Sequence, residues 1–547
     1  MPASINGTLK IDFDVPVKWN KGGDNGKGRK LKILLLYPNF PMSHLLLPAG
    51  VSILSACLKQ AGFDTRLFDT TLYKPEGFSQ DDLRIELLQI KKVSTVDRSV
   101  DFKTTNMLDD FKQMLSDYQP DLVGASLLED TFPIGLPLMR AAHDAGILVL
   151  AGGIFPTFAP DDAINEESVD ILCRGEGEIA LVELCRRLAA GVSYDNIPNL
   201  WIKKPDGTVV QNQMGPTVNV DELPLPDYDM FDAQRFFRPM QGKLLRIMPI
   251  EMHRGCPYQC AFCEDPIQSQ MYRAIGERYH RAKSPQTLIR ELLVLVNKYN
   301  AEYIYFNAET FFAMPDRYFV ELAELYIKEI RLPFWMQTRP ETLTDKHVEL
   351  LKEMNVSHVN IGLEHGNEEF RAKVLKRKMA NSLIINGLRN LHDAGIPTTV
   401  NNIMGFPDET RELVFDTIEL NRHIQSATIN AFLFNPYKGT ELYDVCEEKG
   451  YLPPEGDEKT IDSFLSEEFP YFKAILRMPT ISREELMGLQ RTFVLYAKLP
   501  RSEFPRIRIA EKFDEAGDEM FRVLREEFLS GQHEQAAMEE SAELQKA

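Results

Sequence analysis

The sequence predicts an α/β protein: an N-terminal doubly wound sheet, then a partial (β/α)6 barrel, then a C-terminal helical region. Three observations predict this class. Short apolar runs alternate with amphipathic helical segments along most of the chain, which is the pattern of parallel strands joined by helices. This rhythm is interrupted between residues 193 and 240, so the chain contains two βα series. Finally, a chain of 547 residues is too long for one ordinary hydrophobic core.

The first series follows a polar leader, residues 1–30, which we expect to be flexible. The run "LKILLLYP" that begins at Leu31 is continuously apolar, as expected of a strand buried on both faces. An amphipathic helix is predicted at 48–63, with a proline at its start and a glycine near its end. Further strands are predicted at "TRLFD", 121–126, 147–153 and 169–175, with helices between and after them. We therefore expect residues 31–192 to form an open sheet, whose ligands bind beyond the carboxyl ends of its strands.

Residues 193–240 lack this alternation. "KKPDGTVV" is typical of a hairpin and "DELPLPDYDMFD" of an extended, proline-rich linker, so we place the domain boundary here. The second series, 241–478, contains six predicted strands with helical segments between them, which suits an incomplete barrel. After it, 479–530 is predicted to be helical and 531–547 to be a disordered tail.

Polar side chains gather where the strands of the predicted barrel end. Catalytic groups of such barrels come from the carboxyl ends of the strands. A single polar residue there is more often a turn or cap residue, but four successive strand ends carry pairs of them, which indicates a site. The pairs are Asn307 and Glu309, Gln337 and Arg339, Glu364 and His365, and Asn401 and Asn402.

Composition and net charge disfavour some classes of binding partner and some cellular locations. The formal net charge is −19, which repels phosphate backbones, so a nucleic-acid partner is disfavoured. The N-terminus lacks the apolar core of a secretion signal, and no apolar run approaches the roughly 20 residues that span a bilayer. The seven cysteines form no even disulfide framework. These features predict a cytoplasmic protein in a reducing compartment, without a membrane span.

The stretch "MHRGCPYQCAFCEDP" places Cys256, Cys260 and Cys263 within eight residues. Three thiolates do not complete a tetrahedral structural zinc site, so a zinc site would need a fourth ligand such as His253. The alternative is a [4Fe–4S] cluster held at three corners, whose fourth iron is open to a small chelating ligand. Because this loop directly follows the first barrel strand, an open iron would face the barrel mouth.

The spacing Cys-x3-Cys-x2-Cys, with the aromatic Phe262 before the last cysteine, resembles that of the radical S-adenosylmethionine (radical SAM) superfamily. "IGLEHGNEEFRAKVLKR", "IMGFPDET" and "FNPYKGTELYDVCEEKGYL" resemble segments of the branch with an N-terminal cobalamin-binding domain. "GGIFPTFAPDDA" and "CRGEGE" resemble that domain itself. The resemblance covers about residues 31–475. It implies a Rossmann-like cobalamin (B12)-binding domain followed by a radical SAM barrel.

The resemblance implies three cofactors: a [4Fe–4S] cluster on the three cysteines, S-adenosylmethionine and cobalamin. In this family the reduced cluster cleaves S-adenosylmethionine, and the resulting 5′-deoxyadenosyl radical removes hydrogen from an unactivated C–H bond. The protein excludes water and orients the target. Residues at positions that match S-adenosylmethionine contacts are Phe262, Glu309, Arg339, Glu364 and Gly405. Among them, Arg339 suits a bidentate role toward the carboxylate.

The motif Asp-x-His-x-x-Gly, whose histidine ligates cobalt in several cobalamin enzymes, is absent from the sequence. The resemblance therefore implies a corrin without a histidine ligand, which should favour donation of a methyl group. Candidate corrin-binding residues follow two predicted strands of the first sheet. They are Ser126, Glu129, Asp130 and Thr131 in "SLLEDTFP", and Gly152 and Gly153 in "AGGIFPT". The two glycines permit close approach of the backbone.

The leading hypothesis is a B12-dependent radical SAM enzyme that methylates an unactivated carbon of a small-molecule or natural-product substrate. A ring-forming or ring-rearranging enzyme with the same cofactors would share every motif above. An RNA-modifying methylthiotransferase is a further alternative. It predicts a second cluster, whereas Cys57, Cys173 and Cys185 are scattered over two predicted helices and a strand. A non-catalytic iron–sulfur or zinc-stabilised protein is the remaining class.

The leading hypothesis also requires an external one-electron donor of the flavodoxin or ferredoxin type. The sequence assigns no catalytic acid or base.

Overall fold

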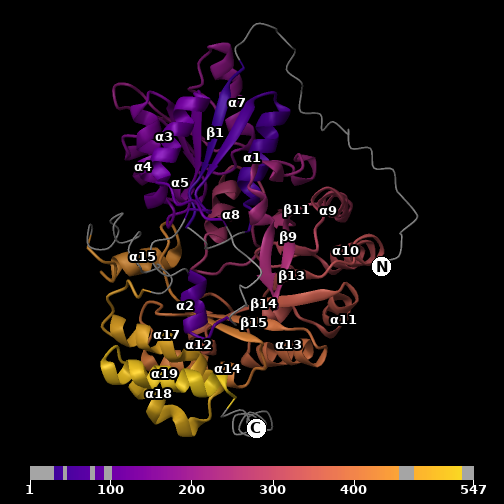
Figure 1. Cartoon of the computed structure of the whole chain (residues 1–547), viewed down its shortest axis with the longest axis vertical. Coiled ribbons are helices and arrows are strands. Elements are labelled where there is room, and N and C mark those ends of the chain that lie inside the picture. Colours follow the sequence, from indigo (N-terminus) through magenta and orange to yellow (C-terminus); the bar gives the residue numbers. More distant parts are fainter. Residues whose placement is uncertain (1–29, 41–45, 74–79, 91–100, 455–472, 532–547) are drawn as a thin grey trace.

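The computed structural model describes residues 30–40, 46–73, 80–90, 101–454 and 473–531. Figure 1 shows two sheets with their helices, the first at the top and the second below it, and a helical C-terminal region beside the second. The predicted leader and tail lie almost wholly outside the described residues. Within the described residues, every helix is too short or too polar to cross a bilayer.

The first sheet is parallel over five strands, which lie in the order β2-β1-β3-β4-β5. They are β1 (Lys32–Tyr37), β2 (Asp64–Asp69), β3 (Leu122–Ser126), β4 (Leu148–Gly152) and β5 (Ile171–Cys173). Strands β1 and β3 are neighbours although β2 separates them in sequence, so the winding of the chain reverses at this pair. Open α/β sheets bind ligands at such a switch point, outside the carboxyl ends of the strands. The predicted doubly wound fold is confirmed.

Helices cover both faces of the first sheet. Helix α1 (Ala49–Gln60) packs with α7 (Glu178–Ala190) on one face. Helix α3 (Met107–Tyr118) packs with α4 (Phe132–Asp144) on the other. Both faces of the strands are therefore buried, which is why their sequences are continuous apolar runs. Two short helices join β4 to β5: α5 (Ile154–Phe158) and α6 (Pro160–Asn165).

The hairpin that was predicted in the linker belongs to the first sheet instead. Its strands, β6 (Leu200–Lys203) and β7 (Val209–Gln211), continue the sheet in antiparallel pairing from β5. Trp201 and Ile202 are buried in this position. A hairpin sequence specifies its own turn but not the sheet edge that it joins, so the sequence alone could not reveal this pairing. The extended linker begins after Gln211.

The second sheet has six parallel strands in sequential order, as expected of a partial (β/α)6 barrel. They are β9 (Lys243–Glu251), β12 (Tyr303–Asn307), β13 (Phe334–Thr338), β14 (Val356–Glu364), β15 (Thr398–Met404) and β16 (Thr428–Leu433). Strand β8 (Phe237–Met240) pairs antiparallel with β9. The main intervening helices are α9 (Pro285–Tyr299), α10 (Asp316–Glu329), α11 (Asp345–Glu353), α13 (Asn381–Asp393) and α14 (Arg411–Arg422). The predicted fold class is therefore confirmed for the barrel as well.

Strand β16 lies at the open edge of the partial barrel. On this edge, the carbonyl of Ala431 accepts hydrogen bonds from the side-chain amides of Gln490 (3.0 Å) and Gln89 (3.2 Å). Gln490 belongs to α17 (Arg483–Lys498). Gln89 follows α2 (Gln80–Glu86), a helix from the segment after β2 that lies far from its own sheet, beside α17 (Figure 1). These two amides satisfy a backbone group that an unprotected edge would offer to another chain.

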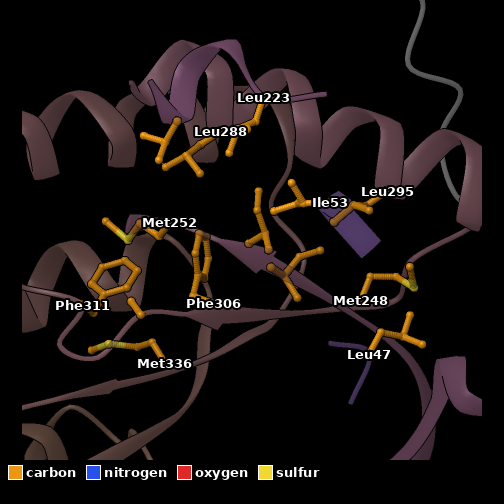
Figure 2. Close-up of a cluster of buried hydrophobic side chains, with 14 of the residues drawn as sticks. Leu47, Ile53, Leu223, Met248, Met252, Leu288, Leu295, Phe306, Phe311 and Met336 are labelled. Atoms are coloured by element: carbon orange, nitrogen blue, oxygen red, sulfur yellow. The ribbon is translucent and has the colours of Figure 1, made fainter. Parts of the chain in front are cut away.

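The hydrophobic core runs from the first sheet into the barrel. Figure 2 shows Ile53 of α1 beside Leu295 of α9, with Met248 of β9 and the linker residue Leu223 in the same cluster. A second cluster joins the C-terminal helices to β15 and β16. These helices are α17, α18 (Phe504–Ala510) and α19 (Glu515–Leu529). Because one core includes side chains from both sheets, apolar packing fixes the first domain on the barrel.

Candidate active site between the two sheets

The three cysteines predicted to bind a cluster lie between β10 (His253–Arg254) and α8 (Asp265–Ala274), directly beyond β9. Cys256 and Cys260 are buried, and Cys263 is partly buried. Backbone hydrogen bonds attach their loop to the barrel, since the N–H of Ala261 donates to the carbonyl of Leu375 at 3.2 Å. The thiols therefore lie at the carboxyl end of the barrel, where barrel enzymes place their chemistry.

Two arginines from neighbouring parts of the barrel approach Cys260. Nη1 of Arg339, which follows β13, donates to its Sγ at 3.2 Å, and this guanidinium lies 3.8 Å from the ring centre of Tyr258. Nη1 of Arg377 lies 3.9 Å from the same sulfur and 3.6 Å from Oε1 of Glu364, at the end of β14. Burial raises the pKa of the Glu364 carboxyl, and the two arginines oppose that rise. The fold thus brings the predicted Arg339 and Glu364 together beside one thiol.

His253 does not supply the fourth ligand that a zinc site would need. Its Nδ1 lies 3.1 Å from the carbonyl oxygen of Gly255 and 3.3 Å from Oε2 of Glu309. Its Nε2 lies 3.1 Å from the carbonyl oxygen of Thr310. Both ring nitrogens are therefore engaged away from the thiols. The remaining donor set, three cysteines with an open position, suits a [4Fe–4S] cluster.

The three thiols must lose their protons before they can bind a metal. Burial raises the pKa of Cys256 to about 11 and that of Cys263 well above its usual value. Across the described ranges, no three His, Cys, Asp or Glu side chains form a ready-made metal site, so the thiols are neighbours in a loop and not an assembled ligand set. This is physically reasonable, because metal ligands usually converge when the metal displaces their protons.

Two further predicted residues, Phe262 and Gly405, are linked through Phe406. The ring centres of Phe262 and Phe406 are 5.9 Å apart. Gly405 has a φ of +86°, and its N–H donates to Glu409, which also accepts from the N–H of Phe406 at 3.0 Å. Oε1 of Glu409 in turn lies 3.0 Å from Nε2 of His365. This buried network fixes the backbone that follows β15.

A cavity of about 320 Å³ lies between the carboxyl ends of the two sheets. One wall includes the predicted Ser126, Gly152 and Gly153 of the first sheet, and the opposite wall includes the predicted Glu309 of the barrel. The predicted residues of two separate domains therefore line one space. Its volume lies in the range of small-molecule and cofactor sites.

Glycines keep this cavity open. At Gly50 of α1, an added methyl group would meet no atom within 4 Å, so it would project into free space. Gly153 has a φ of +104°, and a Cβ there would lie 2.6 Å from the carbonyl oxygen of Leu127. The sharp turn after β4 therefore requires glycine. A cradle of this kind, at the switch point of the sheet, fits part of a corrinoid whose ring faces the barrel.

The other three residues predicted to bind the corrin lie outside the lining of this cavity. Oδ2 of Asp130 accepts from the hydroxyl of Tyr437 at 3.2 Å, and Oε2 of Glu129 accepts from the N–H of Lys438 at 3.2 Å. Oγ1 of Thr131 accepts from the N–H of Leu128. The loop after β3 reaches the barrel, so in this arrangement its carboxylates dock the two domains and its threonine stabilises the turn.

An ion-pair network, which the sequence did not predict, forms another part of the cavity wall. The guanidinium of Arg254 contacts Glu176 (3.0 Å) and Glu178 (2.7 Å) of the first domain, and Glu251 (3.0 Å) of the barrel. Burial pushes the pKa of Glu251 upward, but Arg254 and Lys283 outweigh it and hold the pKa below its usual value. The network therefore joins the two domains at the edge of the cavity.

Sequence reasoning missed Arg254, Glu176 and Arg377, although each carries a signal. Glu176 lies in "RGEGE", at a strand end of the first sheet, and Arg254 directly precedes the cysteine loop. Arg377 lies in the basic run "LKRK", after the end of β14. Charged residues near predicted strand ends, on both sheets together, are the signal for Glu176 and Arg254, whereas the signal for Arg377 is the basic run itself.

Comparisons with known proteins agree with this geometry. Residues 43–185 match the family model of the B12 binding domain, and residues 250–420 match that of the radical SAM superfamily. An uncharacterized methyltransferase of Pyrococcus horikoshii is 26% identical over 342 residues, covering 61% of this chain and 71% of that protein. The anaerobic magnesium-protoporphyrin IX monomethyl ester cyclase of Rubrivivax gelatinosus is 21% identical over 471 residues. That alignment covers 84% of this chain and 75% of the cyclase.

Two solved structures share the fold. One is the cobalamin-dependent S-adenosylmethionine radical enzyme OxsB with aqua-cobalamin and S-adenosylmethionine bound, with a TM-score of 0.62 and 14% identity, covering 91% of this chain and 71% of that one. The other is the radical S-adenosylmethionine methyltransferase TsrM from Kitasatospora setae with cobalamin and a [4Fe–4S] cluster bound. The two chains are 16% identical, with a TM-score of 0.59, and the match covers 91% of this chain and 99% of that one.

A B12-binding sheet that faces a cysteine-bearing partial barrel across a shared cavity defines a class of radical enzyme with two cofactor-binding domains. The two family matches together span more than half of the chain. The chain belongs to the cobalamin-dependent radical SAM enzymes. Its cofactors are a [4Fe–4S] cluster, S-adenosylmethionine and cobalamin, as predicted.

Proposed function

We propose that this enzyme transfers a methyl group to an unactivated carbon of a small-molecule substrate. The shared cavity carries the proposal: Ser126 and Gly152 of the B12-binding sheet face Glu309 and His253 of the barrel across one space. Methyl transfer to an unactivated carbon needs a methyl carrier and a radical source in one water-excluding site. The named methyltransferase among the relatives also supports it.

When bound, the cluster and S-adenosylmethionine supply a carbon radical, and cobalamin supplies the methyl group. The protein's own part is to hold and orient these groups. Arg339 and Glu364, with opposite charges beside Cys260, would hold the carboxylate and the ammonium of S-adenosylmethionine. The backbone at Gly152 and Gly153 would meet the corrin, and the buried Gly405–Glu409 turn would shape the adenine end.

Reconstitution under anaerobic conditions tests the proposal. The full chain, purified with added cobalamin, is expected to hold about four irons and one cobalt per chain. Incubation with a reductant, S-adenosylmethionine labelled in its methyl group, and metabolite extracts should yield a product that gains the labelled methyl. Iron without cobalt, or labelled S-adenosylmethionine that is cleaved while no product gains the label, would count against a methyltransferase.

The variant Gly50→Leu tests the cavity as the cobalamin site. Because the added side chain meets no atom within 4 Å at its Cβ, the chain is expected to fold normally while the leucine fills the cavity. Cobalt content should fall at least tenfold with iron content unchanged. Gln60→Leu, at the far end of the same helix, is the matched control and should retain cobalt. Full cobalt in Gly50→Leu would place cobalamin elsewhere.

Ring formation or rearrangement is a second candidate function. The observation that favours it is the coverage of the cyclase relative, whose alignment spans 84% of this chain against 61% for the named methyltransferase. The same labelling experiment separates the two functions. A cyclase product loses hydrogen and carries no label, whereas a methylated product carries the labelled methyl.

The proposal also includes an external one-electron donor of the flavodoxin or ferredoxin type and a reducing, cytoplasmic location. A reduced flavodoxin that supports S-adenosylmethionine cleavage by the reconstituted enzyme would satisfy the first requirement.

A further inference from the structure

The inner face of the barrel is more polar than packing requires. Side chains along a strand point alternately to its two faces. Along β14, Val359, Ile361 and Leu363 are completely buried in the core toward the helices, whereas His358 and Asn360 face inward and are partly exposed. Barrel interiors are normally filled by packed Val, Ile and Leu. Partly exposed amides and imidazoles in these positions present hydrogen-bonding groups to the space inside the barrel, which is called the lumen below.

Two hydrogen-bonded chains of side chains line this lumen. In the deeper one, Nε2 of His358 lies 2.7 Å from Oγ1 of Thr399, which lies 2.6 Å from Oγ1 of Thr428. The other chain of side chains lies nearer to the carboxyl ends of the strands. There Nη2 of Arg84, from α2, donates to Oδ1 of Asn430 at 3.2 Å, and Nδ2 of Asn430 donates to Oδ1 of Asn401 at 2.8 Å.

The second chain has a fixed polarity. A guanidinium donates hydrogen bonds and cannot accept them, so the oxygen of Asn430 must face Arg84 and its nitrogen must face Asn401. Oδ1 of Asn401 therefore accepts, and its Nδ2 remains as a donor without a protein partner among the described residues. The amide of Asn360, one strand away, likewise has no partner within the described part of the chain. Two amides are thus presented to the lumen.

The lumen carries little charge. At the inward positions of β13, β14, β15 and β16, which are fully described, the formal charge is that of Glu364, at the strand end beside the thiols. Arg84 of α2 adds one positive charge beside Asn430, so these two formal charges cancel. Burial lowers the pKa of His358 to about 4, so this imidazole is neutral at neutral pH. The inward side chains between these points are amides, hydroxyls and apolar groups.

We infer that the lumen selects substrates with an uncharged, oxygen-rich group, such as the polyhydroxylated ring of a sugar or a nucleoside, whose oxygens accept from Asn401 and Asn360. The inference rests on the proposed function in taking the lumen as the place of the substrate. A purely apolar substrate would displace water from both amides and would form no hydrogen bond with them, which costs free energy. Arg84 is a positioning residue, because it orients Asn401 through Asn430. The helix that carries Arg84 comes from the segment after β2, so the first domain takes part in substrate selection.

Saturation-transfer NMR on the reconstituted holoenzyme tests the substrate class. Excess S-adenosylmethionine is kept present so that a nucleoside probe does not report on that site. The probes are N-acetylglucosamine, uridine and toluene. We expect saturation transfer to at least one polar probe. The transfer should be at least fivefold weaker in Asn401→Leu and unchanged in Asn390→Leu, a matched control on helix α13, which covers the outside of the barrel strands. Transfer to the sugar alone indicates a glycosidic group, and transfer to uridine alone a nucleoside.

Two results would overturn the inference. One is the absence of transfer to both polar probes, with or without transfer to toluene. The other is full transfer in Asn401→Leu. The role of Arg84 has its own test: Arg84→Met should weaken transfer as Asn401→Leu does, whereas Arg84→Lys should restore most of it, because the ammonium still donates to Asn430. Equal loss in both variants would contradict positioning.

These measurements are independent of the methylation assay. Probe binding that depends on Asn401, together with products that never gain a labelled methyl, would refute the proposed methyl transfer and leave the substrate class standing. Methylated products from an enzyme whose lumen does not bind the polar probes would support the proposed methyl transfer and refute the substrate class.

Discussion

Cys260 is the residue on which the charges of the site converge. Arg339 reaches its sulfur from the end of β13 and Arg377 from a loop well beyond the end of β14, and Glu364 balances the charge of Arg377. A cluster bound by three thiolates adds negative charge to a buried pocket, where opposite charges interact strongly because water is excluded. In the proposed function, both guanidinium groups would offset the charge of the cluster, and Arg339 would also hold the carboxylate of S-adenosylmethionine.

Arg339→Met tests this double role. We expect about a tenfold loss of affinity for S-adenosylmethionine, equivalent to about 1.4 kcal/mol, because a charge-assisted hydrogen bond is lost. Equilibrium dialysis of radiolabelled S-adenosylmethionine against the reconstituted enzyme measures it, with iron content checked in parallel. Arg389→Met, on the exposed side of α13, is the control. Unchanged affinity with full iron content would remove Arg339 from the binding site.

His358 should make stability depend on pH. Burial lowers its pKa to about 4, whereas in the unfolded chain it binds a proton near pH 6.5. The unfolded state therefore binds more protons between these values, and stability must fall as the pH drops through that window. From pH 7 to pH 5, the wild type should lose about 2 kcal/mol more than His358→Gln. Denaturant unfolding at both pH values measures the difference, with the exposed His143→Gln as control. Parallel pH profiles for wild type and His358→Gln would contradict the expectation.

At the scale of elements, the open edge of the barrel is the feature that most needs support. A closed barrel has no edge, but β16 ends this sheet and exposes backbone groups along one side. Helix α17 packs against β16, and Gln490 and Gln89 both donate to the carbonyl of Ala431. An edge that would otherwise attract other strands is thereby covered by two segments from opposite ends of the chain.

The two glutamines should be coupled in stability. Gln490→Leu or Gln89→Leu alone leaves one donor on the carbonyl, so each should cost about 1 kcal/mol. The double variant leaves a buried carbonyl without a partner and should cost about 1–2 kcal/mol more than the sum of the two. A double-mutant cycle by chemical unfolding measures the coupling. Strict additivity would show that the amides do not share this acceptor.

At the scale of the whole molecule, the cavity forms only where the two domains dock against each other. The Arg254 network, the Asp130–Tyr437 contact and the shared apolar core all lie where the two sheets meet. The cavity has walls from both domains, so neither domain alone would form it. Cofactor binding should therefore depend on residues that never touch the corrin.

Arg254→Met tests this dependence. It leaves Glu178 buried without the cation that contacts it, whereas Glu176 keeps Arg281 and Glu251 keeps Lys283, and it should cost about 3 kcal/mol in the stability of the docked state. We expect faster proteolysis in the linker after Gln211 and lower cobalt retention than in the exposed control Arg290→Met. Intact cobalt content and unchanged proteolysis in Arg254→Met would show that apolar packing alone holds the domains together.

The sequence by itself determined the features that local patterns encode. Unbroken apolar runs predicted the strands of both sheets, and Ser284 caps α9 as its sequence implies. The spacing of Cys256, Cys260 and Cys263 predicted a cluster loop, and the strand ends pointed to Arg339 and Glu364, which the structure brings close to Cys260. The strands and the helix cap are confirmed because strand burial and helix capping depend on neighbours within a few residues. The assignment of the three cysteines as cluster ligands stays a prediction.

Only the tertiary structure decided which distant residues share a space. It carried Arg84 into the barrel, placed Arg377 beside Cys260, and turned Glu129 and Asp130 toward the barrel loop. It also added the hairpin to the first sheet. Each of these contacts joins segments whose approach follows from the packing of whole domains, and no local periodicity in the sequence carries that information.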